Sequence, residues 1–236
     1  MWFRNARDGA NTPRALQGWI GPRDMLDMLE SDVAAANKKL SDFSYDPLRD
    51  ADGLGLRPYQ IEAIANTEAA VVKGDRTALL EMAAGTGKTR IVPGMIHRFL
   101  KSGRFKRILL LTGHAVDGQA PDVFRNVNVE NHMTLEQLYN ARPNQKIHVS
   151  TVPALFERIF IDSGGVMPSV TEYDLIIADE ACQGCNPDEY REVLDYFDAV
   201  NIVLTADSAQ HAAEAFGRPV FTYPHSRAVA EGYLAE

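Results

Sequence analysis

A short glycine-bearing segment holds the residues of this chain that are best suited to bind an anion. Gly85 and Gly87 let the backbone turn tightly, so that several N–H groups can converge on one phosphate. Lys88 offers a mobile positive charge for the outer phosphates, and the Thr89 hydroxyl can ligate Mg²⁺. A strand predicted at Thr77–Met82 precedes the segment, and the predicted helix after it begins with anion-attracting N–H groups. The pattern favours a nucleotide site over an ordinary strand–loop–helix turn.

Two adjacent carboxylates end another apolar run farther along the chain. Leu175–Ala178 predicts a buried strand, and Asp179 and Glu180 follow it directly. The first carboxylate can hold Mg²⁺ opposite Thr89, usually through water, and the second can deprotonate a water aimed at a γ-phosphate. Alone, such a pair is also typical of a solvated strand end. Together with the Lys88 loop, it favours a nucleotide hydrolase.

Composition and charge narrow the class of protein. The chain has 236 residues, of which 45% are hydrophobic and 24% charged, as is usual for a globular domain. It has no apolar run of membrane-spanning length, and Met1–Gly21 lacks the apolar core of a signal peptide. We therefore expect a cytoplasmic protein without a membrane partner. The net charge of −8 argues against a standalone electrostatic binder of nucleic acid, so any such contact must be local or shared with a partner.

The cysteines and histidines do not form an obvious metal site in the sequence. Cys182 and Cys185 make a C-x-x-C, which suits half a zinc site, a redox pair or two free thiols. The histidines are scattered singly, at positions 97, 114, 132, 148, 211 and 225. Since no second ligand pair stands at suitable spacing, free thiols in a reducing compartment are favoured.

Strands and helices are predicted to alternate after Gly74. Strands are expected at Thr77–Met82, Arg107–Leu111, Ile147–Ser150, Leu175–Ala178 and Ile202–Leu204. Helices are expected at Lys88–Leu100, Asp117–Arg125, Thr134–Tyr139, Pro153–Ile161 and Asp188–Phe197, and a last helix–strand–helix unit at Ala212–Ala235 with its strand at Val220–Tyr223. Strands that are apolar on both faces belong to a parallel sheet covered by helices on both sides. We therefore predict an α/β fold whose ligand binds at the carboxyl ends of the strands.

A separate N-terminal part is predicted before this domain. Met1–Pro22 has an irregular pattern, whereas Arg23–Leu40 has the spacing of an amphipathic helix, with an apolar stripe at Leu26, Leu29, Val33, Ala36 and Leu40. We expect that stripe to pack on the main domain, with a partner interface as the alternative. Tyr45–Gly55 is loop-like, and a further helix runs from Arg57 to about Val72. The expected division is a linker with its helix over residues 1–50 and one domain over residues 51–236.

Several segments together resemble superfamily 2 helicases and translocases, and most closely the motor of the type I restriction enzyme R subunit. Arg57–Ile64 is similar to that family's Arg-x-Tyr-Gln-x-x-Ala-Ile segment, and Met82–Thr89 to its Met-Ala-Thr-Gly-Thr-Gly-Lys-Thr loop. Asp179–Ala181 is similar to its Asp-Glu-Ala-His box. Further matches lie at Arg104–Leu111, Gln119–Ala120, Ser150–Val152, Tyr196–Val200, Leu204–Ala206, Phe216–Tyr223 and Ala228–Leu234. The resemblance covers about Gly55 to Leu234, and it accounts for Met82, which stands where the general phosphate-loop pattern has a small residue.

The resemblance implies a three-layer RecA-like fold and assigns roles to individual residues. It makes Lys88, Asp179 and Glu180 catalytic, and gives Mg²⁺ to Thr89 and Asp179. It places ATP at Arg57, Tyr59, Gln60, Ala84, Gly85, Thr86, Gly87, Lys88 and Thr89, with the glutamine reading adenine. It places one DNA strand at Thr112, His114, Gln119, Thr151 and Val152, and coupling at Thr205 and Ala206.

The resemblance also implies partners and a prokaryotic cytoplasm. The partners are double-stranded DNA held through one strand, a second RecA-like lobe in the same or another chain, and modification and specificity subunits. No second motor domain or N-terminal nuclease is recognisable in the sequence. We therefore expect weak ATP–Mg²⁺ binding and slow hydrolysis by this lobe alone, since an arginine finger from elsewhere contributes roughly 10³ to 10⁵ in rate.

Departures from the family pattern support a second interpretation. Cys182 replaces the last residue of the acidic box, Asp207 and Ser208 replace Thr-Pro, and His114 lies where an arginine is usual. The segment after Glu180 is also short. These changes favour, as the alternative, a catalytically weakened nucleotide-binding module with a regulatory or assembly role. A small-molecule kinase is disfavoured by the matches around Gln60 and Thr205.

A basic cluster follows the phosphate-loop helix. It consists of Arg98, Lys101, Arg104, Lys106 and Arg107. A solvated helix C-terminus, which favours cations, explains the cluster, and contact with DNA phosphates is the alternative.

Overall fold

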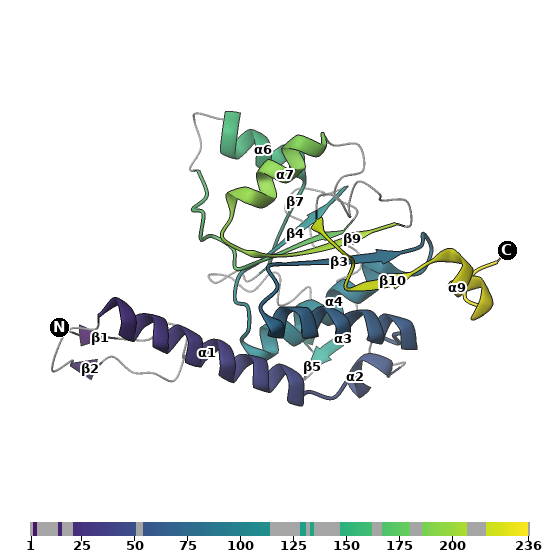
Figure 1. Cartoon of the computed structure of the whole chain (residues 1–236), viewed down its shortest axis with the longest axis horizontal. Helices are drawn as coiled ribbons and strands as arrows, with labels where there is room; N and C mark the ends of the chain where they lie inside the picture. The colour runs from purple at the N-terminus through teal and green to yellow at the C-terminus, as the bar shows by residue number, and fades with distance from the viewer. Residues whose placement is uncertain are drawn as a thin grey trace.

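The computed structural model has a six-stranded parallel sheet between two layers of helices (Figure 1). It describes residues 2–3, 14–15, 21–50, 54–113, 128–130, 133–134, 147–161, 167–179, 186–206 and 216–235. The strand order is β10-β3-β9-β8-β4-β7. The strands are β3 (Thr77–Met82), β4 (Ile108–Thr112), β7 (Ile147–Ser150), β8 (Leu175–Asp179), β9 (Val200–Thr205) and β10 (Phe221–Tyr223). The predicted α/β class with a mainly parallel sheet and a helical N-terminal segment is confirmed.

Helices cover both faces of this sheet (Figure 1). One face carries α1 (Pro22–Asp42), α2 (Asp46–Arg49), α3 (Pro58–Lys73) and α4 (Lys88–Ser102). The other carries α6 (Val152–Phe156), a π-helical turn (Glu157–Ile161) and α7 (Pro187–Tyr196), while α9 (His225–Ala230) follows β10. Short antiparallel pairs join β1 (Trp2–Phe3) to β2 (Arg14–Ala15) and β5 (Asn128–Glu130) to β6 (Met133–Thr134). Within the described residues, no helix is both long and apolar enough to cross a membrane.

The central strands β3, β9, β8 and β4 are mostly apolar on both faces because each face meets a separate helical layer. All five residues of β8 are buried. Successive side chains of a strand point to opposite faces, and neighbours accordingly enter different cores. Leu80 and Ile177 pack in the core beneath α3 and α4, whereas Leu79 and Ile176 pack in the core beneath α6 and α7. The sheet is therefore held from both sides, which fixes the loops at its ends.

Most predicted elements agree with the structure, and four local differences stand out. β3 and β7 have the predicted bounds, but Pro153–Ile161 divides into α6 and a π-helical turn. The predicted loop at Tyr45–Gly55 contains α2, because Pro47 suits a first helical turn and Leu48 is buried in the core. Thr134 lies in β6 rather than starting a helix, and Met1–Pro22 contains the β1–β2 pair. The predicted helices at residues 117–125, 135–139 and 212–215 lie outside the described residues.

The predicted solvated end of α4 is wrong for Arg98. Its guanidinium is 3% exposed and donates to both oxygens of Glu68, at 2.6 and 2.9 Å. It also donates to the carbonyl oxygens of Leu40, Phe43 and Ser44. Arg98 therefore does not face solvent or DNA. It ties the end of α1 and the segment after it to the main domain.

The apolar stripe of α1 is buried only in its second half. Ala36 and Leu40 are buried, as predicted, but Leu26 and Leu29 are 57% and 36% exposed. The prediction that these two leucines pack on the domain is wrong, because the first half of α1 extends beyond the helices of that layer (Figure 1). Helical periodicity indicated which side of α1 is apolar, but not how far along the helix the domain surface beneath that side extends.

Candidate functional site

The carboxyl ends of the strands bring the predicted site residues to one edge of the sheet. Leu204 of β9 pairs with Leu80 of β3 on one side and with Asp179 of β8 on the other. Asp179 in turn pairs with Thr112 of β4. The loop that begins after β3 and the carboxylate that ends β8 are thus separated by one strand. With strands spaced about 4.8 Å apart, that separation is about 10 Å across the sheet.

The loop after β3 has the backbone of a phosphate cradle. Gly85 and Gly87 both have φ of 78°, in the left-handed region that side chains rarely adopt. A Cβ on Gly87 would come within 2.6 Å of the Gln60 amide nitrogen, so the position is closed to other residues. Gly87 is also the N-cap of α4 and has no side chain with which to cap it. The Arg90 N–H donates to the Gly87 oxygen, and a helix that begins at the loop without a side-chain cap suits an anion.

Lys88 lies inside this loop. The residue is buried, and its ammonium donates to the carbonyl oxygens of Met82 and Ala83 at 3.0 and 3.4 Å. Thr86 donates its hydroxyl to the Ala83 oxygen at 2.6 Å. Thr89 is exposed at the start of α4, as are Ala84 and Gly85 in the loop. The available donors are the glycine turn, the first turn of α4, the Lys88 ammonium and the Thr89 hydroxyl. This set fits a triphosphate with Mg²⁺.

The segment at the start of α3 holds the loop from behind. The Tyr59 hydroxyl donates to the Thr86 oxygen at 2.8 Å. The Gln60 amide nitrogen donates to the carbonyl oxygens of Thr86 and Gly87, at 3.1 and 3.3 Å, and its oxygen accepts the Arg57 N–H at 2.9 Å. Gln60 is 2% exposed. Tyr59 and Gln60 therefore touch the loop, and Arg57 stands at its rim.

The acidic side of the site is described only in part. Asp179 is 8% exposed at the end of β8, next to Thr112. Glu180 lies outside the described residues, and the roles of both carboxylates stay predictions. The other predicted site residues and departures that lie outside are His114, Gln119, Cys182, Cys185, Asp207 and Ser208.

Those predicted DNA and coupling residues that the structure describes lie at the same edge. Thr151 caps α6, since its hydroxyl oxygen accepts the Ala154 N–H at 3.4 Å. Val152 is fully buried, backbone included. Thr205 ends β9 beside Glu81 of β3, and Ala206 follows it. Thr205 thus stands between the loop and the acidic strand, while the DNA contacts stay predictions.

Sequence reasoning missed the tyrosines that the C-terminal unit brings to the loop. The Tyr223 ring is stacked on Tyr59, with centroids 4.0 Å apart and planes 6° apart. The Tyr233 ring lies 5.1 Å from Tyr59. Burial, together with the hydrogen bond to Glu231, raises the pKa of the Tyr223 hydroxyl, and that bond lowers the pKa of Glu231. The segments that contain Tyr223 and Tyr233 resemble the family pattern, but nothing in their local sequence indicated that these rings meet Tyr59.

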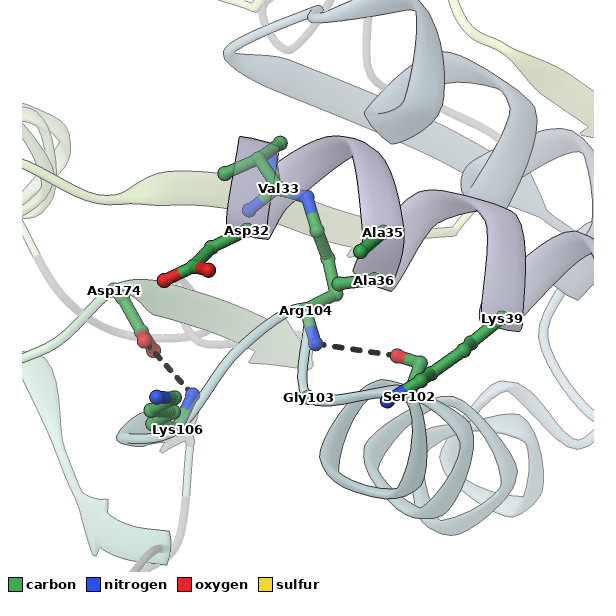
Figure 2. A pocket seen from close by; sticks show the side chains of 10 residues that line it. All are labelled: Asp32, Val33, Ala35, Ala36, Lys39, Ser102, Gly103, Arg104, Lys106 and Asp174. Atoms are coloured by element: carbon green, nitrogen blue, oxygen red, sulfur yellow. Dashed lines mark hydrogen bonds between the residues drawn. The ribbon is translucent and has the colours of Figure 1, made fainter. Parts of the chain in front are cut away.

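A hollow of about 340 Å³ lies elsewhere, between α1 and the turn after α4 (Figure 2). Asp32, Lys39, Arg104, Lys106 and Asp174 line it. Asp174 accepts the N–H groups of Lys106 and Arg107 at 2.8 and 2.9 Å, and burial raises the pKa of its carboxyl group. Because Asp174 directly precedes β8, the hollow is at the amino ends of the strands. It is separate from the candidate nucleotide site.

Comparison with known proteins places this arrangement in a family. Residues 53–208 match the family model described as type III restriction enzyme, res subunit. The chain belongs to this family. The expected relation to helicase-like restriction motors is thus confirmed.

Individual relatives agree with the family match. The chain is 37% identical over 263 aligned residues to the type I restriction enzyme EcoKI endonuclease subunit of Escherichia coli K12, covering all of this chain and 22% of that protein. It is 32% identical to the EcoAI endonuclease subunit of Escherichia coli, covering 79% of this chain and 24% of that protein. A fragment of a putative HsdR subunit of a type I restriction enzyme from Vibrio vulnificus YJ016 has the same fold, with a TM-score of 0.54 and 22% identity over 95% of this chain and 40% of that one. The chain thus spans about a quarter of the length of its curated relatives.

Proposed function

We propose that this chain is the ATP-binding and ATP-hydrolysing lobe of a superfamily 2 DNA translocase of the type I restriction kind. The observation that carries the proposal is the shared sheet edge: the Lys88 loop follows β3, Asp179 ends β8, and one strand separates them. A separation of about 10 Å suits a triphosphate and its metal held between the two. The family match and the R-subunit relatives support the same assignment.

Each residue then has a physical role in the site. The glycine turn and the first N–H groups of α4 bind the phosphates, and Lys88 leaves its loop carbonyls to neutralise the outer ones. Thr89 and Asp179 would hold Mg²⁺, which when bound neutralises charge on the transferred phosphoryl group. Glu180, on the sequence pattern, accepts the proton of the attacking water. Arg57, Tyr59 and Gln60 form the side of the site toward the base.

The partners follow from the same proposal. One strand of double-stranded DNA would cross the carboxyl edge near Thr112 and Thr151, beyond the nucleotide site. A second RecA-like lobe, in the same or another chain, would supply an arginine finger, and modification and specificity subunits would supply the DNA sequence preference. We place the chain in the prokaryotic cytoplasm.

Calorimetric titration of the whole chain with Mg–ATP tests the nucleotide site. Lys88→Ala should weaken binding at least about tenfold, because a charge-assisted contact to phosphate contributes roughly 1.5–3 kcal/mol. Lys73→Ala removes an exposed lysine at the end of α3 and should leave the affinity unchanged. Equal affinities of the wild type and both variants would show that the loop is not part of the nucleotide site.

The departures at Cys182 and at Asp207–Ser208 favour the second candidate, a nucleotide-binding module without turnover. Glu180→Gln separates the two. Loss of phosphate release with ATP binding retained supports the hydrolase. ATP binding together with no difference in turnover between Glu180→Gln and the wild type supports the module.

A further inference from the structure

The last described residues turn back toward the phosphate loop. α9 ends at Ala230, and Gly232, with φ of 75°, reverses the chain so that the N–H groups of Tyr233 and Leu234 reach the Ala228 oxygen. A Cβ at Gly85 would lie 3.3 Å from the Leu234 methyl group, so the two residues are neighbours. The C-terminal turn is therefore part of the wall of the loop.

Tyr233 and Arg57 are in direct contact at this wall. The guanidinium carbon of Arg57 lies 4.7 Å from the centre of the Tyr233 ring, in a cation–π contact. The guanidinium also donates to the Tyr59 hydroxyl at 3.3 Å, and the Arg57 N–H is fixed by Gln60. Arg57 nonetheless remains exposed. Its guanidinium therefore contacts a ring while the residue keeps surface that a ligand can reach.

The contacts of this group connect it to the phosphate loop. The Tyr59 hydroxyl that contacts Arg57 is bonded to the Thr86 oxygen of the cradle, so the guanidinium lies one tyrosine away from the phosphates. Gln60, in contrast, directs its amide nitrogen to two loop carbonyls and its oxygen to Arg57, and is almost wholly buried. Arg57 is thus a flat, exposed group beside the loop, whereas Gln60 is not exposed.

We propose that Tyr233 is a positioning residue that holds the Arg57 guanidinium as the platform on which the nucleotide base stacks. The inference rests on the proposed function, in which the Lys88 loop binds the triphosphate. Guanidinium planes stack on aromatic rings, and a base provides such a face. In this proposal Tyr233 acts through Arg57 rather than through its ring contact with Tyr59, so its effect belongs to the base and not to the phosphates.

The test compares two ligands on the whole chain by calorimetric titration: Mg–ATP and Mg–tripolyphosphate, which has no base. Tyr233→Ala and Arg57→Met should weaken Mg–ATP binding about tenfold, which is about 1.4 kcal/mol, and should change tripolyphosphate binding less than about twofold. Tyr233→Phe should restore ATP affinity, because the ring face and not the hydroxyl makes the contact. Tyr196→Ala truncates a half-buried tyrosine on the opposite helical layer and should leave the ratio of the two affinities unchanged.

The outcomes separate the inference from the proposed function. If the wild type binds neither ligand, the proposed function fails and the inference fails with it. If the wild type binds both, the inference is overturned when Tyr233→Ala weakens both ligands equally or weakens neither. Should Tyr233→Ala fail to fold, Arg57→Met decides: loss of ATP affinity alone supports the platform, and an unchanged ratio refutes it.

Discussion

Arg98 and Arg76 each approach a carboxylate oxygen to 2.6 Å, but only one of these ion pairs should matter for stability. The side chains of Arg98 and Glu68 are 3% and 6% exposed, whereas those of Arg76 and Asp198 are 64% and 66% exposed. Arg98→Met would leave the Glu68 carboxylate buried without its cation and three carbonyl groups without this donor. Breaking one partner of a buried pair costs roughly 3–5 kcal/mol, while an exposed pair contributes about 0–1 kcal/mol.

Urea unfolding followed by circular dichroism measures this difference. We expect Arg98→Met to lower the free energy of unfolding by at least about 3 kcal/mol, and Arg76→Met by at most about 1 kcal/mol. The double variant with Glu68→Leu should be more stable than Arg98→Met alone, because the uncompensated charge is gone. Similar losses for Arg98→Met and Arg76→Met would show that burial is not what gives the Arg98 pair its strength.

Two further predictions concern the left-handed backbone conformation of glycines and the protonation of His148. Gly87→Ala should weaken Mg–ATP binding at least about tenfold and destabilise the fold by about 1–2 kcal/mol, since the new methyl group meets Gln60 at 2.6 Å in a left-handed conformation. Gly74→Ala, with nothing within 4 Å, should cost stability only and leave binding intact, as titration of both variants would reveal. Burial lowers the pKa of His148, so the unfolded chain takes up a proton before the folded one and stability falls as the pH drops below about 6.5. His148→Gln should flatten that fall between pH 7.5 and 5.5 in urea titrations, and an unchanged pH dependence would exclude His148 as its source.

The local sequence was enough to predict the features that depend only on residues adjacent in the chain. The segment Thr77–Met82 became a strand with the predicted bounds, because a strand with its middle residues buried on both faces needs mainly its own residues to be apolar. The edge strand Ile147–Ser150 also has the predicted bounds, although only Ile147 is buried in it. The glycine turn before Lys88 was predictable because its positive φ angles depend on the glycines of the turn itself.

What depends on distant partners was not predictable in this way. Arg98 sits in a basic cluster, and its burial is decided by Glu68 and by carbonyl groups in the segment after α1. The contact of Tyr233 with Arg57 likewise joins the two ends of the domain. Periodicity assigned Leu26 to an apolar stripe but could not reveal that the surface beneath the stripe ends before reaching it.

The place of β9 in the sheet has a mechanical consequence. Leu204 is hydrogen-bonded neighbour to both Leu80 and Asp179, so one strand fills the whole gap between the lysine turn and the acidic tip. A ligand that draws the ends of β3 and β8 together would compress β9, whose distance from each neighbour is fixed by its two hydrogen-bond ladders. The ladder to β8 ends at Leu204 and the ladder to β3 ends at Thr205, so Ala206 is the first residue whose backbone neither ladder holds.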